Sequence, residues 1–121
     1  MPHIVLEYSD NVPDKIDFPS LFSSIHNELA ATGLFSINDI KSRVIKHSSY
    51  YIGDSNPAQG FVTVTLAILS GRDDIIKKQL SDTILEILKS YFPESLSLLK
   101  FSITVQIKDI HRNSYGRFTS K

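Results

Sequence analysis

The chain has 121 residues and a mass of 13.6 kDa, and its thirteen basic residues balance thirteen acidic ones. A single domain of this length buries enough surface for its own core, whereas a neutral chain has no excess charge for general nucleic-acid binding. No cysteine is present, which excludes disulfides, cysteine-ligated metals and thiol catalysis.

The first half of the chain, about residues 2–50, has the pattern strand, helix, strand. Residues 3–8 form a short apolar run typical of a buried strand. A capping-rich segment with Pro13 follows, and then a helical stripe that Gly33 ends. Residues 37–47 predict a second strand, and a polar loop fills residues 48–60. The helical stripe consists of Phe18, Leu21, Phe22, Ile25 and Leu29.

The second half, about residues 60–110, repeats this order. Residues 61–69 are rich in β-branched side chains and predict a strand, after which residues 70–74 turn into a helix. That helix has a stripe at four-residue spacing, and Pro93 is expected to close it. Residues 101–107 alternate between apolar and polar and predict a half-exposed strand; residues 111–121 form a polar arm or a loose end. The stripe consists of Ile76, Leu80, Ile84, Leu88 and Phe92.

Two such units predict a four-stranded mixed sheet with both helices on one face, in an α+β domain spanning residues 1–121. The longest apolar-leaning run, residues 61–69, is too short to cross a membrane, and the N-terminus lacks the order of a signal peptide. We therefore expect a cytoplasmic protein without a membrane partner. The uncovered sheet face is too apolar for water on the third strand, so we also expect an oligomer.

Most catalytic and metal-binding motifs are absent. The sequence contains no phosphate-binding glycine loop, no metalloprotease motif and no nucleophile elbow. The histidines at positions 3, 26, 47 and 111 show no ligand spacing and are interpreted as structural or surface residues. Asp73 and Asp74 fit a charge pair at the start of a helix better than an acid/base dyad.

Pro2 lies directly before the first strand. If Met1 is removed, the nitrogen of Pro2 is a secondary amine, and burial or nearby cations would lower its pKa. A neutral amine near pH 7 is a competent general base. Taken alone, however, Met-Pro is a common start of a chain and favours no function.

Three cationic residues are candidates for binding an anion. Arg72 lies where a strand ends and a helix begins, so it and the helix amides would suit an anion. Lys41 and Arg43 are two residues apart on a strand and therefore share a face. Each has an ordinary alternative as a surface residue whose stem covers the sheet.

Several segments together resemble the 5-carboxymethyl-2-hydroxymuconate isomerase family of the tautomerase superfamily. They run in the family's order across nearly the whole chain: Met-Pro-His-Ile-Val-Leu-Glu-Tyr-Ser-Asp-Asn at residues 1–11, Leu-Ala-Ala-Thr-Gly at 29–33, Ser-Arg-Val at 42–44, Gly-Arg at 71–72 and Ile-His at 110–111. The resemblance implies a tautomerase-like fold in a homotrimer with the sheets packed inward.

The resemblance also implies a cofactor-free reaction on an unsaturated 2-oxo or 2-hydroxy acid. Pro2 matches the catalytic base and Arg72 the arginine that binds or polarises the substrate. Lys41 stands where the family has a second functional arginine; it keeps the charge but loses the bidentate fork, which affects the substrate's identity more than the reaction class. Arg43 matches a family arginine with a less defined role. We therefore expect Pro2 and Arg72 to be catalytic, and Lys41 and Arg43 to bind substrate.

Three alternatives remain open from the sequence. One is a tautomerase acting on a simpler enol acid, such as a phenylpyruvate-like compound, which the lysine at position 41 would suit. Another is a non-catalytic trimeric scaffold or ligand-binding relative with the same fold. The third is an interaction domain in which Pro2 is incidental. An enzyme of this type needs a free, buried N-terminus, whereas a scaffold does not.

Overall fold

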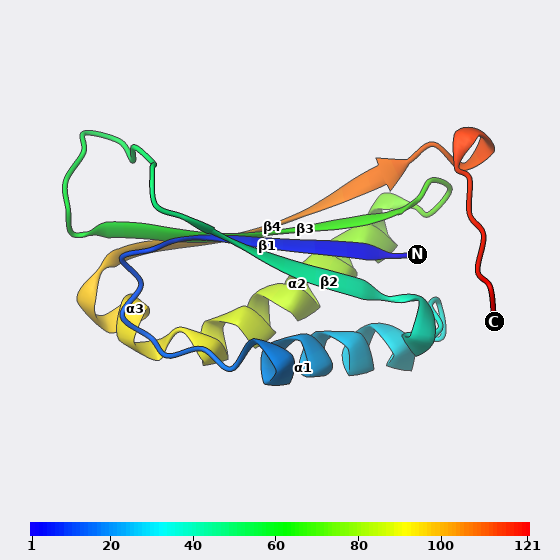
Figure 1. Cartoon of the computed structure of the whole chain (residues 1–121), viewed down its shortest axis with the longest axis horizontal. Helices are drawn as coiled ribbons and strands as arrows, with labels where there is room; N and C mark the ends of the chain where they lie inside the picture. Colours follow the sequence, from blue (N-terminus) through cyan, green and yellow to red (C-terminus); the bar gives the residue numbers. More distant parts are fainter.

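The structure, a computed structural model, describes all residues from 1 to 121 as two β-α-β units (Figure 1). Two short 3-10 turns, at Ile37–Asp39 and Arg112–Ser114, precede β2 and follow β4. The strands and helices in chain order are β1 (His3–Ser9), α1 (Phe18–Ala31), β2 (Lys41–His47), β3 (Gln59–Leu69), α2 (Asp74–Tyr91), α3 (Pro93–Leu98) and β4 (Lys100–Ile110).

The four strands form one mixed sheet in the order β2-β1-β3-β4. Within each unit the strands are parallel, and the two units meet through the antiparallel pair of β1 and β3. In that central pair His3 lies opposite Ala67, so the start of β1 adjoins the end of β3. All helices cover one face of the sheet and leave the other open (Figure 1). The predicted fold class is confirmed.

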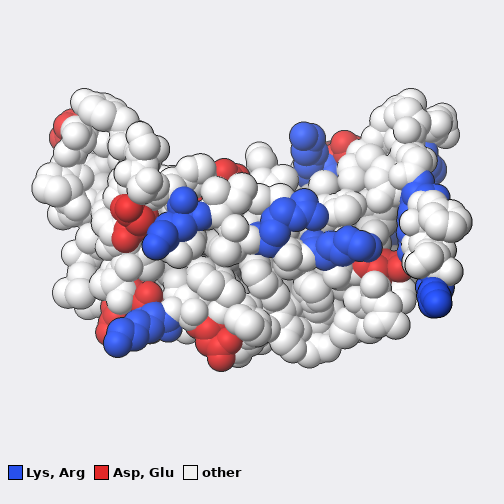
Figure 2. Space-filling view, viewed as in Figure 1, with Lys and Arg blue, Asp and Glu red and all other residues white.

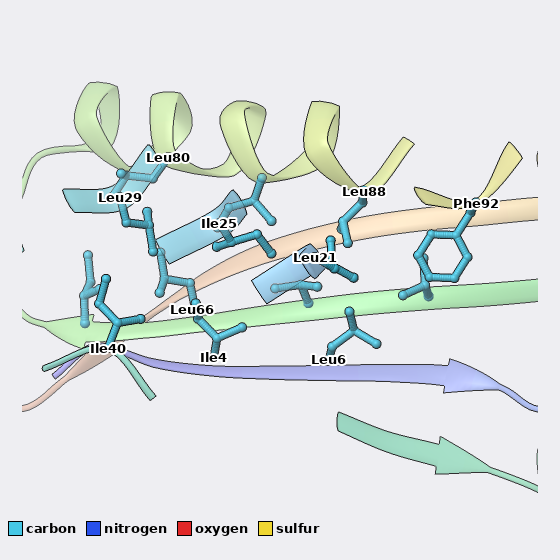
Figure 3. Packing of buried hydrophobic residues seen from close by; sticks show 14 residues of the cluster. Ile4, Leu6, Leu21, Ile25, Leu29, Ile40, Leu66, Leu80, Leu88 and Phe92 are labelled. Atoms are coloured by element: carbon cyan, nitrogen blue, oxygen red, sulfur yellow. The ribbon is translucent and has the colours of Figure 1, made fainter. Parts of the chain in front are cut away.

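The core lies between the helices and the covered sheet face (Figure 3). Both predicted helical stripes point into it, and β3 contributes its even-numbered apolar residues. Burial of each large aliphatic side chain stabilises the fold by about 1.5–3 kcal/mol. The residues that are almost fully buried include Ile4, Leu6, Leu21, Ile25, Leu29, Val62, Val64, Leu66, Ile68, Ile84, Leu88 and Phe92.

Two expected boundaries need correction. The predicted strand over residues 37–47 begins only at Lys41, because Ile37–Asp39 forms a 3-10 turn. Pro93 does more than close α2, since it starts the short helix α3. The carboxylate of Asp14 accepts hydrogen bonds from the amides of Glu94 and Ser95 at 2.7 and 3.0 Å and so caps this helix from a distant segment.

The open sheet face is mixed in character rather than uniformly apolar. Thr63 and Thr104 share a hydrogen bond of 2.9 Å there, and Gln106 donates one of 2.9 Å to Thr65. The face lies in a hollow between the raised loop that precedes β3 and the C-terminal arm (Figure 2). None of the helices is both long and apolar enough to cross a bilayer.

Candidate active site

A cavity of about 210 Å³ lies at the end of the molecule where the chain begins. The antiparallel pairing of β1 and β3 brings the start of β1 next to the end of β3, and the turn into α2 closes one side. The segment after α1 and the C-terminal arm complete the wall. The lining residues are Met1, Pro2, Leu34, Phe35, Asp39, Ile68, Leu69, Arg72, Arg112 and Arg117. The structure thus brings together the two predicted catalytic residues, Pro2 and Arg72.

Pro2 is buried and lines this cavity. Its carbonyl oxygen accepts a hydrogen bond of 3.1 Å from the amide of Lys41, which fixes the proline to the start of β2. The amino group of Met1 donates to the carbonyl of Asp39 at 2.9 Å. Met1 therefore occupies part of the space that a ligand would need to reach the nitrogen of Pro2.

The surroundings of the N-terminus favour a neutral amine. Burial lowers the pKa of the Met1 amino group below its ordinary value of 8.0, and the cations of Lys41 and Arg117 lower it further, while Asp39 opposes them. Pro2 is buried whereas Met1 is partly exposed, and both residues line the same cavity.

Arg72 is positioned by the turn between β3 and α2. Gly71 precedes it with a φ of +125°, a conformation that a residue with a Cβ rarely adopts. The guanidinium lies 4.9 Å from the centre of the Phe35 ring and donates to the carbonyl of Leu34 at 3.2 Å. Its Nε is buried without a hydrogen-bond partner in the chain. A buried donor without a partner costs free energy, so the structure bears this cost at the position of Arg72.

The expected anion site on the amides of α2 needs correction. The carboxylate of Asp73 caps this helix and accepts a hydrogen bond of 2.9 Å from the amide of Ile76. The helix start is therefore already supplied with an anion by the chain itself. An anion beside Arg72 would therefore not have the amide of Ile76 available to it.

Lys41 and Arg43 share the open face of the sheet, as expected from their spacing, but neither lines the cavity. The Nζ of Lys41 donates to the carbonyl of Asp39 at 3.3 Å. Arg43 bonds to Nδ1 of His3 at 3.0 Å, and the hydroxyl of Tyr115 lies 3.3 Å from the other ring nitrogen. Burial lowers the pKa of His3, and the N-terminus, Arg43 and Lys41 lower it further.

Four polar or aromatic residues of the cavity were missed by sequence reasoning: Phe35, Asp39, Arg112 and Arg117. Arg112 and Arg117 belong to the arm, which contains three basic residues and no acidic one in a chain that is neutral overall. This local excess of charge was a signal that could have indicated an anion site. Basic side chains gather at the same end of the surface, beside the chain termini (Figure 2).

The structure contains no group of three or more His, Cys, Asp or Glu side chains that could hold a metal ion. The cavity instead combines a buried proline, an aromatic ring and several guanidinium groups. The guanidinium groups can stabilise negative charge that develops on a bound acid. The fold, with a buried proline before β1 and an arginine after β3 lining one cavity, is that of the tautomerase-type proteins.

Comparison with known proteins identifies the family within this class. A family model described as 5-carboxymethyl-2-hydroxymuconate isomerase matches residues 2–118. The chain is 31% identical over 111 residues to the 5-carboxymethyl-2-hydroxymuconate Delta-isomerase of Escherichia coli, covering 92% of this chain and 88% of the relative. The chain belongs to the 5-carboxymethyl-2-hydroxymuconate isomerase family, and its enzyme class is that of the isomerases.

Solved structures agree with this assignment. A 5-carboxymethyl-2-hydroxymuconate isomerase from Deinococcus radiodurans R1 superposes with a TM-score of 0.88 at 26% identity, covering 98% of this chain and 90% of that one. A fused 4-OT described as a symmetric trimer shares the fold, with a TM-score of 0.74 at 9% identity over 95% of this chain and 90% of the other.

Proposed function

We propose that this protein is a cofactor-free isomerase that moves a proton within an unsaturated 2-hydroxy or 2-oxo carboxylic acid. The observation that carries the proposal is the burial of Pro2 in one cavity with Arg72. The relative from Escherichia coli is named for 5-carboxymethyl-2-hydroxymuconate, a conjugated enol acid with three carboxylates. We take this compound as the first substrate to test.

In the proposed mechanism Pro2 acts as the general base after Met1 is removed. While Met1 is attached, the nitrogen of Pro2 is an amide and has no basic lone pair. Removal of Met1 frees this nitrogen and opens the part of the cavity that Met1 lines. Burial and the cations near this cavity lower the pKa of the Met1 amino group, and the same effects would favour the neutral form of an amine on Pro2.

Arg72 is the proposed binder of the developing negative charge. Pro2 takes a proton from the enol oxygen or a carbon of the conjugated system, which leaves a dienolate. The guanidinium of Arg72, which lines the cavity, stabilises that anion where the charge develops. The protonated amine of Pro2 then returns the proton at another carbon, so the product differs only in the position of its double bond.

Lys41 and Arg43 remain proposed substrate-binding residues, but unlike Pro2 and Arg72 they do not line the cavity. Lys41 lies outside the cavity wall, and its charge lowers the pKa of the Met1 amine. We expect the same effect on the amine of Pro2 once Met1 is removed. Arg43 reaches the cavity end only through His3.

We also propose that the chain assembles as a homotrimer through its open sheet face. The face carries Phe61, Ala67 and Leu69 of β3 beside polar side chains, and no helix covers it. The fused 4-OT described as a trimer has the same fold. Sedimentation equilibrium tests this proposal, and a monomeric mass at micromolar concentration would contradict it.

The activity is tested with a chain shown by intact mass to begin at Pro2. Turnover of 5-carboxymethyl-2-hydroxymuconate and of phenylenolpyruvate is followed by the change in ultraviolet absorbance. Turnover of the first acid supports the proposal. Activity on phenylenolpyruvate alone would indicate a tautomerase for a simpler enol acid, and no turnover of either acid would favour a non-catalytic relative.

A further inference from the structure

Three arginine side chains line the cavity together: Arg72, Arg112 and Arg117. One carboxylate, that of Asp39, is the only acidic side chain among the lining residues. The side chains that line the cavity therefore carry two more positive than negative charges. Cations that converge in this way repel one another, and a bound polyanion removes that repulsion.

Arg112 is held against the turn that carries Arg72. Its Nε donates to the carbonyl of Ser70 at 3.0 Å, and its backbone amide donates to the hydroxyl of Ser70 at 3.3 Å. A Cβ at Gly71 would lie 3.9 Å from its terminal nitrogen. The guanidinium of Arg112 thus lies beside the turn and is anchored by the ends of β3 and β4.

Arg117 completes the opposite side of the cavity. Its terminal nitrogen lies 2.8 Å from Oδ1 of Asp39, in an ion pair that ties the arm to the 3-10 turn before β2. The contact between Tyr115 and His3 holds the same arm to the start of β1. The arm therefore lies along its own chain's cavity and brings a guanidinium to it.

Each of the three guanidinium groups keeps most of its donors for a ligand. A guanidinium has five N–H donors, and each of the three makes one hydrogen bond to an oxygen of the chain. Its planar fork matches the two oxygens of a carboxylate better than a lysine ammonium does. Lys41 does not line the cavity, so the cations that line it besides Arg72 are the guanidinium groups of Arg112 and Arg117 in the arm.

We infer that Arg112 and Arg117 are specificity-determining residues, which bind the carboxylates of a di- or tricarboxylate distant from its reacting end. The inference rests on the proposed function for the role of Pro2 and Arg72 at the reacting end. It predicts that the protein prefers polycarboxylates to monocarboxylates of similar size. Arg112 and Arg117 of the arm would then select the substrate by its distant carboxylates, and Arg72 in the turn into α2 would bind the end that reacts.

Binding of two unreactive probes tests this inference without turnover. Calorimetry measures the Kd of tricarballylate, a tricarboxylate, and of phenylacetate, a monocarboxylate, on the chain that begins at Pro2. The variants are Arg112→Gln and Arg117→Gln, with Lys121→Gln as the matched control because Lys121 is an exposed cation of the same arm that does not line the cavity.

The unmodified chain is expected to bind tricarballylate more tightly than phenylacetate. Each arginine variant should weaken tricarballylate binding about ten- to a hundredfold, the range for a hydrogen bond to a charged group, and change phenylacetate binding by much less. Lys121→Gln should leave both Kd values unchanged. Absence of tricarballylate binding to the unmodified chain, or equal losses in the Lys121 control, would overturn the inference.

A second variant covers the case in which Arg117→Gln loosens the arm. If Arg117→Gln lowers the melting temperature, Arg117→Lys is compared instead, because it keeps the charge and loses the fork. It should weaken tricarballylate binding about tenfold, and an unchanged Kd would overturn the role of Arg117. Failure of the proposed function would give a different result. The chain would then bind tricarballylate selectively but turn over neither enol acid.

Discussion

Replacing Arg72 by alanine separates catalysis from folding. In the proposed mechanism this substitution removes the charged donor that faces the dienolate. Loss of one such donor costs about 10²–10³ in rate, or about 2.7–4 kcal/mol of transition-state stabilisation. We therefore expect kcat/KM on the enol acid to fall by that factor.

The folding cost of Arg72→Ala is small by the same structure. The variant loses one hydrogen bond to Leu34 and the contact with the ring of Phe35, which together contribute about 2 kcal/mol. It also removes a buried Nε without a partner, whose burial costs about 1–3 kcal/mol. These effects oppose each other, so the melting temperature should change by about 5 °C or less.

Steady-state kinetics and thermal unfolding on the same samples check this prediction. Lys78→Ala is the matched control, because Lys78 lies on α2, is 73% exposed and pairs only with Asp82 at 2.7 Å. Lys78→Ala should leave both kcat/KM and the melting temperature near their original values. The reasoning is refuted if Arg72→Ala retains kcat/KM within threefold, or if its loss of activity is explained by unfolded protein.

Two further predictions concern the electrostatics and the core. Lys41→Gln removes a cation that lowers the pKa of the N-terminal amine, so the acidic limb of the pH profile of kcat/KM should move to higher pH. Arg43→Gln, on the same strand, should leave that limb where it is. Equal profiles for the unsubstituted protein and both variants would contradict this prediction. Leu88→Ala should reduce the free energy of unfolding, measured by urea titration, by about 2–5 kcal/mol, because Leu88 is fully buried. Leu98 is 68% exposed, so Leu98→Ala should reduce it by less than about 1 kcal/mol. Similar losses in both variants would be inconsistent with the core described.

The double β-α-β order could be predicted from the sequence because both signals are local. Stripes at three- and four-residue spacing indicated the helices, and alternation in residues 101–107 indicated β4. The residues of both stripes do face the sheet, and Leu21, Ile25 and Leu88 are fully buried. The approach of Pro2 and Arg72 followed from family resemblance rather than from spacing, since 70 residues separate them.

The features that were missed depend on contacts between distant segments. The helix α3 is capped by the carboxylate of Asp14, about 80 residues earlier, and no local pattern shows that pairing. The arm has no helical or strand period, so its approach to the cavity through Arg117 and Asp39 was not visible either. One miss is local: the strand predicted over residues 37–47 begins only at Lys41, because Ile37–Asp39 forms a 3-10 turn.

The central claim is that the nitrogen of Pro2 is the catalytic base. It is tested most directly by comparing kcat/KM for 5-carboxymethyl-2-hydroxymuconate between two chains that differ only in Met1, each verified by intact mass and by the same melting temperature. The chain that begins at Pro2 should be about 10²–10⁴-fold more active, the usual contribution of a general base. Equal activity of the two chains would contradict the claim, because an amide nitrogen cannot accept the proton.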